Sequence, residues 1–382
     1  MGVKEAKESS HTPIPKRTII FPEWPKTPKH HNTPPMRLFK GIALLLIVLA
    51  LAFAGFFFWA RSGTLADDEF AVLTVYDDGA VRPAALRDTF SVMTYNLGYL
   101  SATANNRPVK TTAAFFAENM EAAAALIRRV DPDIIAFQEI DFGGGRSYEV
   151  HQLDTLAARG GYSASATAVN WDKRYVPFPS ANPLLHFGSV LSGQAVLSRY
   201  PIRQHERVVL ERAPYPFYYD AFYLDRLAQV VVVDLGRPLV LINVHLEAYD
   251  AATRQRQARQ VRTLVERYRD THAVVLLGDF NSLLPVSKLS PLLPARRRAY
   301  FANDQTLETL LAGSGLREAF ADTVYRAAEA ATLTFPADAP TVKIDHIFYE
   351  PDDIEAVEAF VVGGPHQPSD HRAVVMRFVF RE

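Results

Sequence analysis

Two polar side chains close a strongly apolar segment in the second half of the sequence. Val274–Asn281 reads Val-Val-Leu-Leu-Gly-Asp-Phe-Asn, so a glycine and then Asp279 and Asn281 follow four apolar residues. On an extended backbone, side chains two residues apart project from the same face. A carboxylate and an amide held in this way can position a water molecule and a phosphate oxygen. The ordinary alternative is a buried strand that ends in a polar turn, where Asp and Asn are common.

Other polar residues suited to phosphate or metal chemistry follow or open apolar runs along the chain. They are Asn96, Glu139, His245, the pair Asp345-His346 and the pair Asp370-His371. Taken singly, each has an ordinary explanation, because a lone histidine at a strand end is more often a hydrogen-bonded structural residue than a catalyst. Together with Asp279 and Asn281 they make six such positions in one region, which favours a single pocket where these side chains meet.

Short apolar strands separated by a few helices would have to position these residues. The strands are expected over residues 91–95, 133–137, 195–198, 230–235, 239–244, 274–281, 344–349, 356–362 and 373–380, and the helices over residues 113–130, 148–159 and 253–269. Residues 160–190 lack a clear period and are expected to form a long surface loop. The solvent-exposed face of the last helix is expected to carry Arg254, Arg256, Arg259 and Arg262. Strands joined partly by hairpins and partly by helices indicate a mixed sheet-rich core with outer helices.

The N-terminal part of the chain has a different character. Residues 1–40 are rich in proline without an apolar period, which is typical of a disordered tail. Residues 41–60 carry no charge, and as a helix they would span about 30 Å, the thickness of the hydrocarbon core of a bilayer. A buried helix would show a polar stripe, and a signal peptide would begin nearer the N-terminus, so a transmembrane helix is predicted. Residues 61–89 are expected to be a linker with one weak strand at 70–76, and residues 90–382 the folded domain.

The charges are unevenly distributed along the chain. Residues 1–40 hold eight Lys and Arg against three Glu, a net charge of +5, so residues 61–382 carry −6 of the total of −1. The positive-inside rule then predicts a single-pass protein with a cytoplasmic N-terminus and an extracytoplasmic domain. A mildly acidic domain weighs against tight binding to a nucleic acid backbone. The absence of cysteine excludes disulfides and thiolate chemistry.

Taken in order, six short motifs resemble those of the endonuclease/exonuclease/phosphatase superfamily, which has the deoxyribonuclease-I-like fold. The motifs are Tyr95-Asn96, Gln138-Glu139, Asn243-Val244-His245, Gly278-Asp279-Phe280-Asn281, Ile344-Asp345-His346 and Ser369-Asp370-His371. The resemblance covers about residues 88–382. It implies an α/β fold of the α+β type, a four-layer sandwich of two mixed β-sheets flanked by helices, here preceded by one transmembrane helix.

The resemblance also implies a metal site and a nucleophilic water. Glu139 would hold a divalent cation, Mg²⁺ with Mn²⁺ as the alternative, helped by Asn96 and Asp370. Hard oxygen ligands of this kind suit Mg²⁺. Asp279 would orient or deprotonate the attacking water, and Asn281 would fix its position against the phosphorus.

The histidines are implied to stabilise the negative charge that builds on the phosphorus. His245 and His371 would face the non-bridging oxygens, and Asp345 would hydrogen-bond to His371 and favour its cationic form. In another account of the family, the histidine at position 371 is the general base, and the sequence does not choose between the two. Substrate-binding positions are expected at Asn170, Arg174 and Glu247. No equivalent is identified for the Tyr or Arg that nucleases of this family place against the scissile phosphate.

The function predicted from these features is that of a membrane-anchored, divalent-metal-dependent phosphoric ester hydrolase. It would act as a phosphodiesterase or phosphatase on a lipid head group or a small phosphorylated metabolite, with residues 41–60 in the bilayer and no obligate protein partner. The first alternative is an endonuclease or exonuclease. The second is a non-catalytic, membrane-tethered binding module on the same fold.

Overall fold

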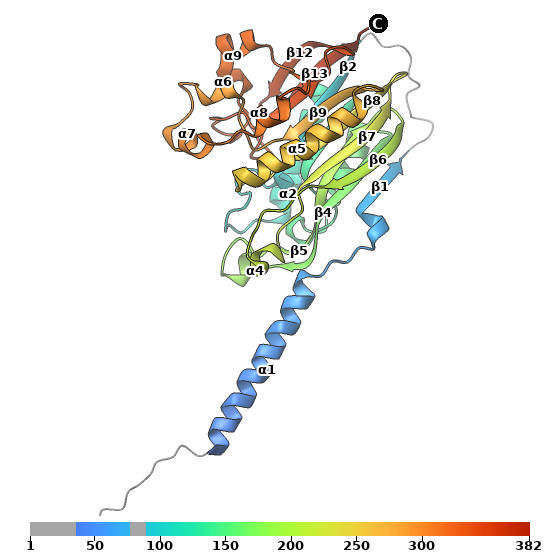
Figure 1. Ribbon diagram of the computed structural model, residues 1–382. Coiled ribbons are helices and arrows are strands. Elements are labelled where there is room, and N and C mark those ends of the chain that lie inside the picture. The colour runs from blue at the N-terminus through green and yellow to red at the C-terminus, as the bar shows by residue number, and fades with distance from the viewer. Residues whose placement is uncertain (1–35, 77–88) are drawn as a thin grey trace, which may run out of the picture. The chain divides into compact units, whose positions relative to one another are not determined.

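A computed structural model of the protein describes residues 36–76 and 89–382 (Figure 1). The chain divides into two compact units, residues 1–54 and 55–382. The tail predicted for residues 1–40 falls mostly outside the described residues, as does the second half of the predicted linker.

The first described element is a long apolar helix, α1 (Met36–Arg61). It contains the whole of the predicted transmembrane segment. Its stretch Leu38–Arg61 has a mean hydropathy of 2.8 and is, by length and composition, apolar enough to cross a membrane.

The described part of residues 55–382 forms two mixed β-sheets. The seven-stranded sheet has the order β1 (Ala71–Val75), β4 (Ala164–Val176), β5 (Gly188–Ser198), β3 (Ile134–Asp141), β2 (Phe90–Asn96), β13 (Ala373–Phe380) and β12 (Ile354–Val362). The six-stranded sheet has the order β10 (Arg317–Glu318), β11 (Asp345–Tyr349), β9 (Ala273–Asp279), β8 (Pro238–His245), β7 (Leu227–Asp234) and β6 (Ile202–Val209). Each sheet has one parallel pair, β2 with β3 and β8 with β9, and its other pairs are antiparallel.

Helices cover the outer face of each sheet (Figure 1). Successive side chains of β2 point to opposite faces of the sheet. Val92 enters the core between the two sheets, whereas Met93 packs with Phe116 and Met120 of α2 (Ala113–Val130) on the outer face. The helix α3 (Gln152–Gly160) lies on the same side as α2. The six-stranded sheet is covered by α5 (Ala251–Tyr268) and α8 (Thr306–Leu311). The short helices are α4 (Phe217–Asp220), α6 (Pro285–Lys288), α7 (Ala295–Phe301) and α9 (Asp322–Ala328). The four-layer fold predicted from the sequence is therefore confirmed.

A fully buried cluster of amide side chains joins the two sheets inside this apolar core. Gln138 of β3 donates to Oδ1 of Asn243 on β8 at 2.7 Å. Asn243 donates to the side chain of Gln229 on β7 and to the carbonyl of Phe137, at 3.1 and 3.0 Å. Gln194 of β5 donates to the carbonyl of Asn243 at 2.8 Å. These directional bonds fix one sheet against the other immediately below the strand ends.

Two predictions about local structure were wrong. Residues 160–190 are not one long loop, because Ala164–Val176 form the 13-residue strand β4, which pairs with β5 and, over residues 164–168, with β1. Its many small and polar residues hide the strand pattern, although most of them are buried. Arg254 is not on an exposed face either, since it is completely buried and pairs with Asp304 at 3.2 Å.

Candidate active site

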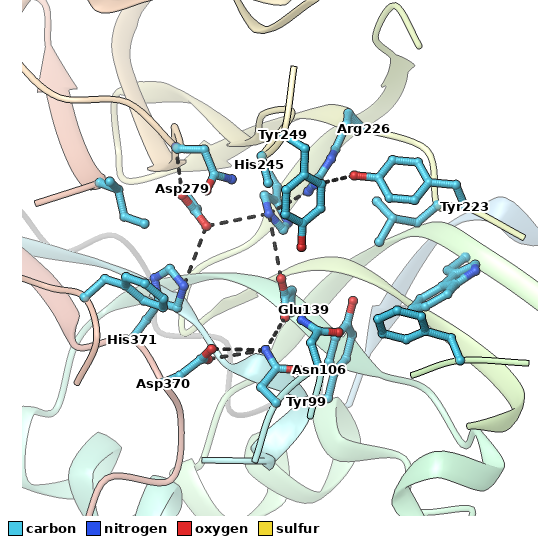
Figure 2. A pocket seen from close by; sticks show the side chains of 18 of the residues that line it. Tyr99, Asn106, Glu139, Tyr223, Arg226, His245, Tyr249, Asp279, Asp370 and His371 are labelled. Atoms are coloured by element: carbon cyan, nitrogen blue, oxygen red, sulfur yellow. Dashed lines mark hydrogen bonds and ion pairs between the residues drawn. The ribbon is translucent and has the colours of Figure 1, made fainter. Parts of the chain in front are cut away.

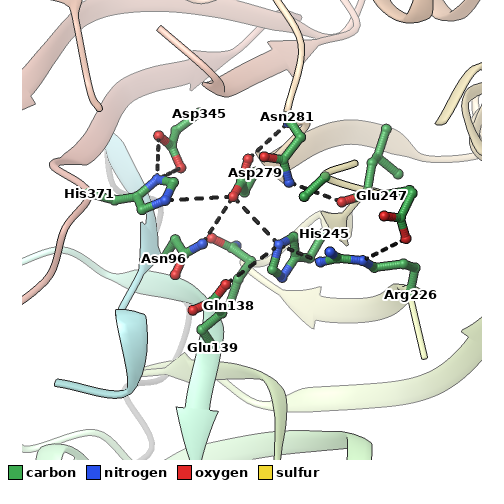
Figure 3. A network of polar contacts seen from close by, with 12 residues as sticks. Asn96, Gln138, Glu139, Arg226, His245, Glu247, Asp279, Asn281, Asp345 and His371 are labelled. Atoms are coloured by element: carbon green, nitrogen blue, oxygen red, sulfur yellow. Dashed lines mark hydrogen bonds and ion pairs between the residues drawn. The ribbon is translucent and has the colours of Figure 1, made fainter. Parts of the chain in front are cut away.

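The carboxyl ends of the two parallel strand pairs meet at one edge of the sandwich. In β8 and β9 the register pairs His245 with Asp279, and in β2 and β3 it pairs Asn96 with Gln138. The side chain of Asn96 crosses between the sheets and donates to Asp279 Oδ2 at 3.0 Å (Figure 3). Six of the predicted residues (Asn96, Glu139, His245, Asp279, Asp345 and His371) are thus brought into one polar network.

Asp279 lies at the centre of this network. Its Oδ1 accepts the backbone N–H of Asn281 at 2.9 Å, while the Asn281 side chain donates to the carbonyl of Leu246. Directly before Asp279, the backbone of β9 lies close against that of β8. A Cβ at Gly278, where φ is 141°, would lie 1.9 Å from the carbonyl oxygen of Val244, so only glycine fits there.

Asp345, His371 and Asp279 form an acid–imidazole–acid array. Nδ1 of His371 lies 3.0 Å from Asp345 Oδ2, and its Nε2 lies 3.8 Å from Asp279 Oδ2. Burial alone would lower the pKa of His371, but the Asp345 and Asp279 carboxylates outweigh it and raise that pKa well above its usual value. Burial raises the pKa of Asp279 to about 7, against the opposing effect of His371. The geometry therefore favours a cationic His371 and a carboxylate of basic strength at Asp279.

His245 is held by a buried arginine that sequence reasoning missed. Nη1 of Arg226 donates to Nε2 of His245 at 2.7 Å, which requires that nitrogen to be unprotonated. Burial, with the charges of Arg226 and His371, lowers the pKa of His245 well below its usual value. His245 is therefore neutral. The charged donor at this position is the guanidinium, rather than the imidazole.

Arg226 is in turn fixed by a carboxylate and a phenol. It lies 3.5 Å from Glu247 and donates to the hydroxyl of Tyr223 at 2.9 Å. Burial opposes the charge on Glu247, but Arg226 and hydrogen bonds from Tyr215 and Tyr223 lower its pKa. The available signal in the sequence was a charged residue directly before the apolar run of β7, because a cation there must either be solvated or find a buried partner.

Glu139 and Asp370 form the part of the site suited to a cation. The amide of Asn105, another residue not predicted, donates to Glu139 Oε2 at 3.0 Å and to both oxygens of Asp370 at 3.3 Å. Burial, followed by the opposing effect of His371 and the repulsion of Glu139, brings the pKa of Asp370 to about 6. Glu139 also has a positive φ of 49°, an unfavourable backbone conformation that aims its side chain. Two crowded carboxylates bridged by an amide donor fit a hard divalent cation.

A second acidic cluster is less suited to a metal ion. Ligand atoms of Asp279, Asp345 and His371 lie within 4.8 Å of one another. Both carboxylate oxygens of Asp345 lie against Nδ1 of His371, so this group is already engaged in holding a proton on the ring. Asn96, predicted as a metal ligand, donates to Asp279 and accepts from the backbone of Gly98. Its role as a ligand remains a prediction.

A pocket of about 420 Å³ lies beside the network (Figure 2). The charged residues that line it are Glu139, Arg226, Asp279, Arg297, Asp370 and His371, together with His245. Figure 2 shows Glu139, Arg226, His245, Asp279, Asp370 and His371 facing the same space. The rest of the lining is mostly aromatic and includes Tyr99, Trp171, Phe178, Phe222, Tyr223 and Tyr249. The three predicted substrate-binding residues, Asn170, Arg174 and Glu247, are not among the lining residues. Substrate contact by these three stays a prediction, whereas Trp171 in the same segment does line the pocket.

Comparison with known proteins places the chain in a family. A profile of the endonuclease/exonuclease/phosphatase family matches residues 93–371, which include every residue of the network. An endonuclease/exonuclease/phosphatase from Beutenbergia cavernae is 22% identical, with a TM-score of 0.53, over 77% of this chain and 72% of that one. A mannosyl-6-phosphatase of Bacteroides thetaiotaomicron is 17% identical, with a TM-score of 0.52, over 76% of this chain and 100% of that one. No curated protein sequence matches significantly. The solved structures support the fold, and the family profile, spanning most of the chain, shows that this protein belongs to the endonuclease/exonuclease/phosphatase family.

Proposed function

We propose that this protein is a divalent-metal-dependent phosphoric ester hydrolase with Asp279 as its general base. The observation that carries the proposal is the convergence on Asp279 of Asn96, His245 and His371 from separate strands and loops. A buried carboxylate of raised pKa beside a cationic imidazole is suited to taking a proton from water while negative charge develops nearby.

In the reaction proposed, the water oxygen attacks the phosphorus in line with the ester oxygen. The new P–O bond forms as the ester P–O bond breaks, the proton of the water passes to Asp279, and the leaving oxygen takes a proton from solvent. His371 and Arg226 stabilise charge on the non-bridging oxygens. Asn281 holds Asp279 through its backbone N–H, and Asp345 keeps His371 cationic.

Glu139 and Asp370 are the residues proposed to hold the cation, with Asn96 as a further candidate ligand. A bound Mg²⁺ or Mn²⁺ would polarise a phosphoryl oxygen and neutralise its charge. Asn105 keeps the two carboxylates together through its amide.

Removing the metal is expected to abolish hydrolysis. Full-length protein in detergent, assayed on soluble p-nitrophenyl mono- and diesters, should lose activity with chelator and regain it with Mg²⁺ or Mn²⁺. In parallel, Mg²⁺ should raise the Tm of the wild type, because ions that bind the native state stabilise it. The Glu139→Gln variant should show no such rise, whereas the exposed control Glu355→Gln should behave as wild type. Undiminished activity after chelation would contradict the metal site, and inactivity on every phosphate ester tested, soluble or lipid, would contradict the proposed function.

The pH dependence follows from the two shifted groups. Activity should rise with pH through about 7, because Asp279 accepts a proton only once it has lost its own. Activity should fall again at high pH, since His371 is needed as a cation and its raised pKa moves this loss upward. In Asp345→Asn the support for the cation is gone, so the alkaline limb should move to lower pH. If the alkaline limb does not move in this variant, the loss of activity at high pH does not arise from deprotonation of His371.

A membrane anchor and an extracytoplasmic domain remain part of the proposal. The length and apolar composition of α1 support the anchor, and the basic excess of residues 1–40 supports the orientation. A nuclease is the alternative enzyme, to be tested by nicking of plasmid DNA. A non-catalytic module is the remaining reading, and the retention of the full polar network weighs against it.

A further inference from the structure

We infer that the substrate is a membrane lipid phosphoester, bound with its apolar part along the aromatic side of the pocket and its phosphate at Asp279. This inference rests on the proposed function and adds the class of substrate to it.

The pocket combines the two surfaces that an amphiphilic phosphoester needs. Its charged residues face the reacting phosphate, and its aromatic residues, among them Trp171, Phe178 and Phe222, provide apolar wall. Burying such rings against hydrocarbon is favourable, because it removes apolar surface of both partners from water. The charge of −6 on residues 61–382 also weighs against a polyanionic nucleic acid as the occupant.

Within the unit 55–382, this aromatic wall is continuous with the end of the apolar helix. Phe57 of α1 contacts Phe222 of the pocket wall with ring centroids 5.4 Å apart, and contacts Phe217 of α4 at 6.3 Å. Phe56 contacts Tyr175 at 5.7 Å. The pocket wall therefore begins at the residues where a membrane-spanning helix would leave the bilayer.

Hydrogen bonds also fix the segment after the helix to the pocket wall. The carboxylate of Asp172, next to Trp171, accepts the backbone N–H groups of Thr64 and Leu65 at 2.6 and 2.9 Å. The backbone N–H of Arg174 donates to the carbonyl of Ser62 at 2.9 Å. The connection is thus short and bonded, and it holds residues 56–65, where the apolar segment ends, against the aromatic side of the pocket.

Large aromatic side chains are exposed beside the pocket. Phe217 is 77% exposed and Tyr218, which lines the pocket, is 61% exposed. Neighbouring aromatic residues of this kind are typical of protein surfaces that lie in the interfacial region of a membrane. A lipid could then reach the site with its chains still in contact with the bilayer.

The test uses full-length protein reconstituted into phospholipid vesicles, with rates measured on long-chain lipid phosphoesters in the vesicle and on soluble dibutyryl analogues with the same head groups. A soluble p-nitrophenyl ester serves as the reference substrate. We expect a marked preference for the long-chain ester. In Phe217→Ser the vesicle rate should fall by about tenfold, the effect of withdrawing one aromatic side chain from an apolar environment. The rate on the p-nitrophenyl ester should be unchanged, because Phe217 does not line the pocket. Val357→Ser, an exposed apolar residue of β12, is the matched control.

Equal rates on long- and short-chain esters, a preference for an oligonucleotide, or a full vesicle rate in Phe217→Ser would overturn the lipid assignment. In each of these cases hydrolysis of the p-nitrophenyl ester leaves the proposed function standing. Failure to hydrolyse the p-nitrophenyl ester as well as the lipids would instead remove both.

Discussion

Replacing Asp279 with asparagine is expected to lower kcat by about a thousandfold, within the range that general base catalysis usually contributes. Asparagine has nearly the same shape, but it cannot accept the proton of the attacking water. It also keeps one oxygen for the N–H of Asn281, so the strand end should retain its conformation. Steady-state kinetics on a soluble phosphate ester, with Tm measured alongside, would show a loss in kcat without unfolding.

The same variant decides which residue is the base. The exposed control Asp322→Asn should keep wild-type kinetics. If Asp279 is the base, the acid limb of the pH profile disappears in Asp279→Asn. If that limb survives and His371→Asn removes it instead, the histidine is the base and the assignment to Asp279 is wrong.

Replacing Arg226 with methionine should damage both activity and stability. Methionine fills much of the same space but leaves the buried carboxylate of Glu247 without its cation, and breaking a buried ion pair in this way costs about 3–5 kcal/mol. Hydrolysis should fall by about a hundredfold or more, because the charged donor beside His245 is lost. Chemical denaturation measures the loss in free energy of unfolding, and steady-state kinetics measures the loss of hydrolysis.

A second change separates these two effects. Adding Glu247→Gln to Arg226→Met removes the unpaired charge and should restore most of the lost stability. It should not restore the activity if Arg226 contacts the phosphate. A double variant that recovers both would mean that Arg226 acts only as a structural partner of Glu247.

The strands of the core were predictable because both faces of each are buried. Runs such as those of β8 and β9 are apolar throughout and end in a polar residue, so their sequence indicates both the strand and its functional end. The strand β4 was not predicted because most of its buried residues are small or polar, so neither an apolar run nor an alternating pattern marks it in the sequence.

The sequence indicated most of the candidate site residues, but not the hydrogen bonds and ion pairs between them. Motifs at strand ends pointed to Glu139, His245, Asp279 and His371, which the fold brings together, but no local pattern predicts that Arg226 hydrogen-bonds to His245. Asn105 lies in a loop between β2 and α2, and only its hydrogen bonds to Glu139 and Asp370 mark it as part of the site. Such roles depend on distances between distant segments, which a single sequence does not specify.

The amide cluster beneath the site has a consequence for motion. Apolar contacts between two stacked sheets have no preferred direction, so they limit sliding less strictly than hydrogen bonds do. The hydrogen bonds from Gln138 to Asn243 and from Asn243 to the carbonyl of Phe137 cross between the sheets and restrict such sliding just below the strand ends. Glu139 on one sheet and Asp279 on the other should therefore keep a constant separation while the outer helices and surface loops fluctuate around them.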